Sequence, residues 1–169
     1  MVKNVLDCNA KFQPSSNLGK KGGIMLDVGD IAPDFAVKDH NGRVVKLSDY
    51  QGKTLVLWFY PRASTGGWTA EGSGFQERIQ DYKAKDVEIL GASTDSIEAN
   101  SKFASDQGFS YPLLCDTERE VCLAYRACKS PSDSSAKRIT YVIGPDGKIL
   151  QAHETVDARK HPETLLSSL

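Results

Sequence analysis

Apolar positions along this chain follow two different periods, and the change from one to the other predicts strands that alternate with helices. Residues 53–60 form a nearly continuous run of strand-forming side chains, which is typical of a strand buried on both faces of a sheet. The segment 68–85 instead places Phe75, Ile79 and Tyr82 three or four positions apart, as in the apolar stripe of an amphipathic helix. The pattern therefore predicts a central strand followed by a helix.

The same pattern predicts the other elements and their order. Two short strands, at 35–38 and 43–46, flank Asp39-His40-Asn41-Gly42, whose Asn-Gly pair favours a tight hairpin. We then expect a strand, a helix, a short strand, a helix, a β-hairpin and a final helix, at residues 87–93, 96–107, 111–115, 118–126, 139–153 and from about 162. Ile97 and Phe103 are expected to face the core. This order favours a three-layer α/β fold of the thioredoxin-like kind, with a mixed central sheet covered by helices on both faces and an N-terminal β-hairpin.

Composition narrows the classes of function. The chain has 169 residues, of which 40% are hydrophobic and 25% charged, and this favours one soluble domain. A formal net charge of -1 gives no field that would attract nucleic acid or an anionic membrane, and no apolar run approaches the ~20 residues of a spanning helix. We therefore expect a cytoplasmic protein that binds neither nucleic acid nor a membrane. Residues 1–24, which are mostly polar and small, are expected to form an irregular extension before a domain at 25–169.

The cysteines predict neither a disulfide framework nor a metal centre. There are four of them, too few and too irregularly spaced for a disulfide scaffold in a chain of this size: Cys8, Cys115, Cys122 and Cys128. We expect them to be reduced, with Cys115 a small, buried and unreactive side chain. A disulfide between Cys122 and Cys128 stays open as an alternative. The spacing of these two matches no zinc pattern, so no metal and no cofactor are expected.

Three separated motifs together carry a resemblance to a known family. They are Val28-Gly29-Asp30-Ile31-Ala32-Pro33-Asp34-Phe35, then Phe59-Tyr60-Pro61 with Thr65 and Thr69-Ala70-Glu71, and then residues 138–147, Arg-Ile-Thr-Tyr-Val-Ile-Gly-Pro-Asp-Gly. In this order and spacing, residues 25–169 resemble the AhpC/TSA-like peroxiredoxins of the bacterioferritin comigratory protein (PrxQ) subfamily. The resemblance implies a thioredoxin fold, a monomer or weak homodimer, and the reduction of hydrogen peroxide and organic hydroperoxides by thioredoxin or a similar thiol reductant.

The active loop of the resembled family reads Thr-Pro-Gly-Cys-Thr, and here the same frame holds Thr65-Gly66-Gly67-Trp68-Thr69. Trp68 therefore stands at the position of the peroxidatic cysteine. Many relatives carry a resolving cysteine five positions later, and this chain has Ser73 there. Both thiols of the usual pair are absent from these positions.

The supporting positions of the site match the family: Pro61, Thr65, Glu71 and Arg138. The resemblance implies that Thr65 aligns the peroxide, that Arg138 stabilises developing charge, and that Glu71 orients the arginine. A helix N-terminus and a nearby arginine lower the pKa of a thiol, which is what a peroxide-attacking thiolate needs. An indole has an N–H donor but no basic lone pair, so Trp68 does not perform that displacement.

Three hypotheses for function follow. In the first, the protein has lost peroxidase activity and is a binding or structural protein on this fold. In the second, residue 68 is natively a selenocysteine encoded by UGA, and the protein is an active peroxidase. In the third, the scaffold catalyses another reaction, with Trp68 as a wall or stacking platform for a small organic ligand. Structural roles stay open beside these: Trp68 as filler of a disused pocket, Thr65 as a helix cap, Glu71 as a partner of the helix dipole, and Arg138 as an ordinary surface charge.

Overall fold

The computed structural model describes residues 23–64, 66–154 and 157–169, apart from the side chain of Trp68. The expected extension at 1–24 and residue Thr65 therefore lie almost wholly outside the described part of the chain. None of the helices in the described part is long and apolar enough to cross a membrane.

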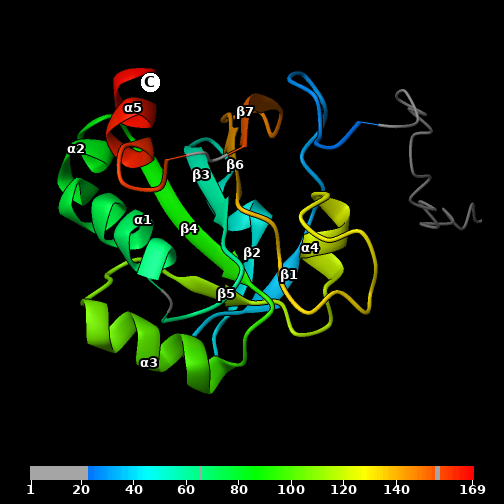
Figure 1. Cartoon of the computed structure of the whole chain (residues 1–169). Helices are drawn as coiled ribbons and strands as arrows, with labels where there is room; N and C mark the ends of the chain where they lie inside the picture. Colours follow the sequence, from blue (N-terminus) through cyan, green and yellow to red (C-terminus); the bar gives the residue numbers. More distant parts are fainter. Residues whose placement is uncertain (1–22, 65, 155–156) are drawn as a thin grey trace, which may run out of the picture.

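A five-stranded mixed sheet forms the centre of the molecule (Figure 1). Its strands, in the spatial order β5-β4-β3-β6-β7, are β5 (Leu113–Cys115), β4 (Val87–Ser93), β3 (Thr54–Phe59), β6 (Ile139–Ile143) and β7 (Ile149–Glu154). Strand β3 pairs in parallel with β4 and antiparallel with β6. All but its first residue are buried, as the apolar run predicts for a central strand.

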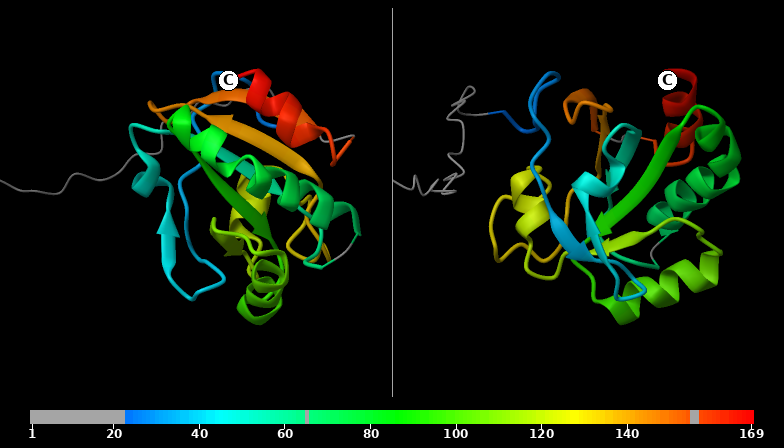
Figure 2. Two further views of the ribbon diagram at one scale, coloured as in Figure 1. Left: turned by 90° about the vertical axis from the view of Figure 1, so that its left-hand side faces the viewer. Right: turned by 180° about the vertical axis from the view of Figure 1, so that it is seen from behind.

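Helices cover both faces of this sheet (Figures 1 and 2). One face carries α1 (Gly66–Glu77), α2 (Ile79–Ala84), α3 (Ile97–Gln107) and α5 (His161–Ser167), which pack on Val56 and Trp58 of β3. The other face carries α4 (Glu120–Ala124) and the separate hairpin of β1 (Ala36–Lys38) and β2 (Val44–Lys46), with the short 3-10 helix η1 (Leu47–Tyr50) next in the chain. Because alternate side chains of a strand point to opposite faces, β3 supplies both cores.

Two expectations about helices are wrong in detail. The helix expected at 68–85 begins at Gly66 and is interrupted at Arg78, whose N–H bonds to the carbonyl of Phe75, three residues back. The chain therefore makes a tighter turn there and continues as α2. Phe103 is buried as expected, but Ile97 is 37% exposed because it is the first residue of α3, directly after the N-cap Ser96.

The expected hairpin between β1 and β2 is present, but its turn is longer than a two-residue Asn-Gly turn. The register pairs Lys38 with Val44, and of the two turn residues only Gly42 has a positive φ, at 76°. The buried Asp39 carboxylate accepts hydrogen bonds from the N–H groups of Asn41 (2.8 Å) and Arg43 (3.0 Å). The N–H of Gly42 also bonds to the carbonyl of Asp39 at 2.9 Å, so backbone hydrogen bonds and the Asp39 side chain together organise this turn.

Candidate active site

The candidate site lies where the chain leaves β3 and enters α1. The N–H of Tyr60 bonds to the carbonyl of Ala92 at 3.0 Å, which extends the β3–β4 pairing beyond the end of β3. Helix α1 then begins at Gly66, so position 68 lies in its first turn. Ligands in open α/β sheets bind at this edge, where carboxyl ends of strands meet unsatisfied N–H groups of helices.

A carboxylate from the neighbouring strand end holds the connecting loop. The N–H of Ala63 donates to Oδ2 of Asp95 at 2.7 Å, just beyond β4. Ser64 has a φ of 60°, in the left-handed region that few residues other than glycine adopt. Asp95 therefore ties the loop that leads into α1 to the same edge of the sheet, a contact that sequence reasoning missed because 32 positions separate the two residues.

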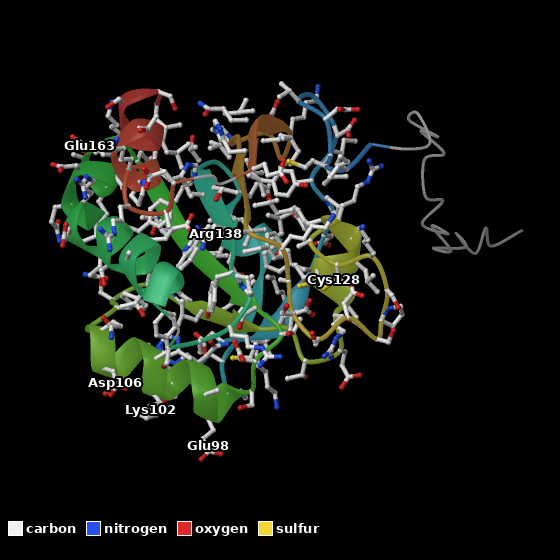
Figure 3. The ribbon with its side chains drawn as sticks, in the orientation of Figure 1. Glu98, Lys102, Asp106, Cys128, Arg138 and Glu163 are labelled. Carbon is white, nitrogen blue, oxygen red and sulfur yellow. The ribbon has the colours of Figure 1, made fainter. Side chains whose placement is uncertain are left out.

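Arg138 reaches this edge from the antiparallel side of β3. Trp58 pairs with Thr140, so the register carries Arg138 to the level of Tyr60. A Cβ atom placed on Gly67 would lie 2.9 Å from Nη2 of Arg138 and 3.8 Å from its Cζ. Figure 3 shows Arg138 in front of the sheet, on the side of the start of α1. The guanidinium therefore lies against the backbone of the first turn of α1, directly before position 68.

Gly67 is a site residue that the sequence interpretation did not single out. Contacts below 3.0 Å are essentially never seen for a real Cβ, so a larger residue would displace the Arg138 guanidinium or the helix start. At Gly66, by contrast, no described atom lies within 4 Å of the corresponding position. The signal available in the sequence was the retained glycine of the family loop, whose purpose becomes clear only once Arg138 is located.

Glu71 follows one turn into α1, and its side chain is completely buried. A buried carboxylate requires polar or charged partners, and both Glu71 and Arg138 have such interactions. Burial is the main cause that raises the pKa of Tyr111, and the Glu71 carboxylate adds to it. The Tyr111 hydroxyl donates to the carbonyl of Gly72 at 3.0 Å, so an aromatic side chain from the loop before β5 braces α1 at this level.

The remaining predicted residues of the site differ in how far the structure describes them. Pro61 and Ser73 are half-buried, Pro61 in the loop and Ser73 within α1. Thr65 and the side chain of Trp68 lie outside the described part of the chain. The structure thus brings Gly67, Arg138 and the backbone of position 68 together, and it adds the buried Glu71 on the same helix.

A buried polar network lies beneath the loop. The Tyr60 hydroxyl donates to Oδ1 of Asn100 at 2.6 Å, and Nδ2 of Asn100 donates to Oγ of Ser93 at 3.1 Å and to Sγ of Cys115 at 3.4 Å. Burial, partly offset by the Asn100 hydrogen bond, raises the pKa of Cys115. Cys115 is therefore a buried thiol without activation, as the sequence predicts.

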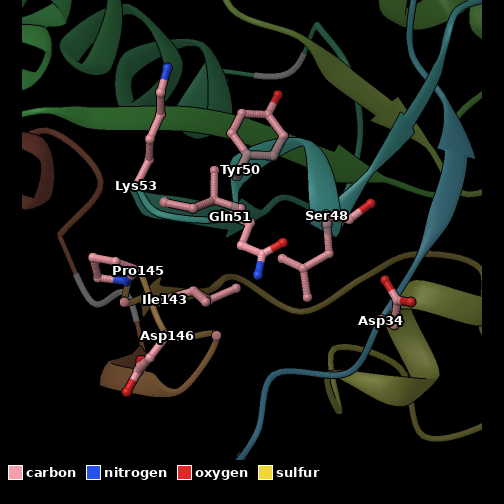
Figure 4. A pocket seen from close by; sticks show the side chains of 12 residues that line it. Asp34, Ser48, Tyr50, Gln51, Lys53, Ile143, Pro145 and Asp146 are labelled. Carbon is pink, nitrogen blue, oxygen red and sulfur yellow. The ribbon is translucent and has the colours of Figure 1, made fainter.

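A cleft of about 260 Å³ lies at the opposite end of β3 (Figure 4). It is bounded by η1 and by the turn between β6 and β7, with Tyr50 and Pro145 in its wall. Burial is the largest cause that raises the pKa of Tyr50 to about 12, so this hydroxyl is neutral at physiological pH. Of the predicted site residues whose side chains the structure describes, none lines this cleft.

The chain is similar to several known proteins. The AhpC/TSA family model matches residues 28–152. The peroxiredoxin Bcp of Escherichia coli is 32% identical over 149 residues, which cover 85% of this chain and 96% of that protein. The crystal structure of the peroxidoxin BcpB from Mycobacterium tuberculosis superposes with a TM-score of 0.78 at 30% identity, covering 83% of this chain and 94% of that one.

A third relative carries a described activity. The bacterioferritin comigratory protein of Xanthomonas campestris, studied for its alkyl peroxide reduction, superposes with a TM-score of 0.74 at 29% identity over 79% of this chain and 88% of that one. These neighbours confirm the thioredoxin-like α/β fold expected from the sequence. The chain belongs to the AhpC/TSA family, as a peroxiredoxin of the Bcp/PrxQ type.

Proposed function

We propose that the chain, with Trp68 at the peroxidatic position, does not reduce hydroperoxides. The identity of residue 68 is the observation that carries this proposal. Reduction of a peroxide requires a nucleophile that attacks one oxygen, forms a bond to it and expels the other as water or an alcohol. The indole of Trp68 supplies no such atom, and burial raises the pKa of Cys115, which disfavours its thiolate.

The described groups around position 68 nevertheless support a site that once served a peroxide-attacking nucleophile. The N–H groups at the start of α1 and the Arg138 guanidinium against Gly67 favour negative charge, both on an attacking anion and on a departing oxygen. We propose that Arg138 stabilises that charge, that Thr65 and Pro61 shape the substrate position, and that Glu71 orients the arginine.

A peroxidase assay on the protein as it stands tests the proposal. The chain, with residue 68 verified by mass spectrometry, is supplied with hydrogen peroxide or an alkyl hydroperoxide and with thioredoxin, thioredoxin reductase and NADPH. We expect NADPH consumption no faster than in the absence of the chain. Catalytic turnover by the verified Trp68 protein would overturn the proposal, and loss of that turnover in Cys115→Ala would locate the responsible thiol.

A second candidate function is that of a selenocysteine peroxidase. The position of the Arg138 guanidinium against Gly67 favours it, because a cation there would stabilise an anionic nucleophile at position 68. A selenolate there would attack the peroxide, and because Ser73 replaces the resolving cysteine, an external thiol would reduce the oxidised selenium. Codon 68 decides this alternative: UGA supports it, and UGG eliminates it.

A further inference from the structure

Helix α4 ends in a chain reversal that brings Cys122 and Cys128 together. The N–H of Ala127 bonds to the carbonyl of Cys122 at 2.7 Å, and the N–H of Arg126 bonds to that of Leu123 at 3.1 Å. With Arg126 at a φ of 60°, this is the Schellman arrangement of a helix C-terminus. The N–H of Cys128 also bonds to the carbonyl of Cys122, at 3.0 Å.

This backbone places the two cysteines within reach of a disulfide. A disulfide spans Cα atoms about 4.4–6.8 Å apart. The backbone hydrogen bond from Cys128 to Cys122 holds the two residues next to each other in space. The thiol groups themselves interact: the Cys128 thiol adds to the effect of burial in raising the pKa of Cys122. Both side chains belong to the same buried cluster, and both cysteines are free thiols in the structure.

Cys128 is the member of the pair that approaches the surface. It is 4% exposed, whereas Cys122 is completely buried, and its Sγ makes a long hydrogen bond of 3.8 Å to the carbonyl of Ser135. Cys128 also lines a cleft of about 510 Å³ together with three cationic residues, Arg126, Lys129 and Lys137. In Figure 3 it lies beside α4, on the other side of Arg138 from α1.

We propose that Cys122 and Cys128 form a reversible intramolecular disulfide, made by exchange with an anionic low-molecular-weight disulfide of the glutathione class that enters the cationic cleft. This redox pair is separate from position 68 and does not depend on the activity proposed for that site.

The exchange takes place in two balanced steps. The Cys128 thiolate attacks one sulfur of the small disulfide, which forms a mixed disulfide and releases one small thiolate that takes up a proton. The Cys122 thiolate then attacks Sγ of Cys128, which closes the intramolecular bond and releases the second small thiol. Two electrons pass from the protein dithiol to the small disulfide, and each protein thiol loses one proton to a leaving thiolate.

The electrostatic surroundings make this exchange slow at neutral pH. Burial is the main cause that raises the pKa of Cys128, the carboxylates of Asp133 and Asp116 add to it, and the neighbouring Cys122 thiol and Arg119 lower it. Only thiolate attacks a disulfide, so the rate of oxidation rises with pH. Thiols that are not stabilised as anions also favour the disulfide at equilibrium, so the bond is slow to form and persistent once made.

Peptide mapping of the full-length chain tests the pairing. The protein is equilibrated with mixtures of reduced and oxidised glutathione at pH 8, quenched with an alkylating agent and digested with trypsin, which cleaves after Arg126, between the two cysteines. We expect peptide 120–126 to be linked to peptide 127–129 and Cys115 to be alkylated as a free thiol. Free Cys122 and Cys128 under oxidising mixtures that leave the fold intact would overturn the proposal.

Variants test the order of attack and the role of the cleft. In Cys122→Ala, oxidised glutathione is expected to accumulate as an adduct on Cys128, whereas in Cys128→Ala the buried Cys122 stays free; an adduct on Cys122 instead would overturn the assigned order. Cys115→Ala is the matched control and leaves the disulfide unchanged. With Cys122→Ala, oxidised glutathione is expected to react severalfold faster than cationic cystamine. Equal rates would contradict the claim that the cationic cleft selects an anionic disulfide.

Thermal unfolding measures what the disulfide does to the fold. Since the bond would close a short loop, its formation is expected to raise the Tm by about 5 °C relative to the reduced chain. The same oxidising mixture should leave the Tm of Cys128→Ala unchanged. An equal shift in that variant would show that another thiol, and not this pair, is responsible.

Discussion

The start of α1 and the end of α4 differ in two properties, the presence of an active-site motif and the presence of a reactive thiol. The start of α1 carries the proposed peroxidase site, with Arg138 against Gly67 and a buried Glu71, but residue 68 has neither sulfur nor selenium. The end of α4 matches no active-site motif, yet two thiols meet there beside a cationic cleft. The comparison shows that a recognisable motif and a reactive group are separate properties, since each can be present where the other is missing.

Restoring sulfur at position 68 is the largest change that the comparison predicts. We expect Trp68→Cys to convert a chain without turnover into a thiol peroxidase, because the helix start and Arg138 are already placed to ionise a thiol and to stabilise the departing oxygen. The measurement is hydroperoxide consumption with the thioredoxin system. Trp68→Phe is the matched control and is expected to remain inactive. A folded Trp68→Cys protein without activity would show that the frame is not functional.

The role of Arg138 is tested in the same background. Arg138→Met, combined with Trp68→Cys, is expected to lower kcat/KM for hydrogen peroxide by on the order of 10²-fold, the usual cost of removing one charge-stabilising donor. It should also raise the pKa of the introduced thiol, read from the pH dependence of its alkylation. Arg159→Met, a change at an exposed arginine, serves as control. Equal effects of the two substitutions would argue against a specific role for Arg138.

Two adjacent glycines provide a finer comparison within the first turn of α1. In the Trp68→Cys background, Gly67→Ala is expected to lower activity by about tenfold. The new Cβ would displace the Arg138 guanidinium, which is the hydrogen-bond donor that stabilises the developing charge. Gly66→Ala meets no described atom within 4 Å and is expected to leave activity unchanged and to stabilise the chain by about 0.5 kcal/mol. Chemical denaturation and peroxidase assays on both variants measure these effects.

The elements that hold the fold together were predictable, since long apolar patterns report burial directly. The run at 53–60 identified β3 as central, and the order of elements identified the mixed sheet. The interruption at Arg78 and the exposure of Ile97 were not predictable, because they depend on how the ends of helices meet their neighbours.

The site was only half predictable from sequence, for a similar reason. The family motif located Arg138 and Glu71, but the purpose of Gly67 requires knowing that an arginine 71 positions later lies against it. The sequence predicted a helix ending near Arg126 but not the shape of the turn after α4, because its left-handed residue is Arg126 in place of the usual glycine. Arg126 is held there by hydrogen bonds from Nη1 to the carbonyls of Gly23 and Met25, which are distant in sequence.

Lowering the pH is expected to destabilise the two faces of the sheet unequally. The start of α1 lies on one face and the end of α4 on the other. His161 of α5 packs edge-on against Phe75 of α1, with ring centroids 6.2 Å apart. Burial, with a smaller contribution from His153, lowers the pKa of His161 from 6.5 to about 4. Because this pKa is lower in the folded than in the unfolded chain, the stability contributed by neutral His161 is fully present above pH 6.5 and is lost as the pH falls toward 4.

The expected loss is about 1 kcal/mol of unfolding free energy between pH 7 and pH 5, allowing for solvent screening of a half-buried ring. It is measured by chemical denaturation at the two pH values, and His161→Gln should reduce the difference. Because His161 contacts α1 and not α4, amide protection factors from hydrogen exchange should fall with pH in α1 and α5 while those of the α4 turn stay constant. A uniform decrease over both faces would mean that acid acts on the whole fold, and that the start of α1 and the end of α4 are not independent.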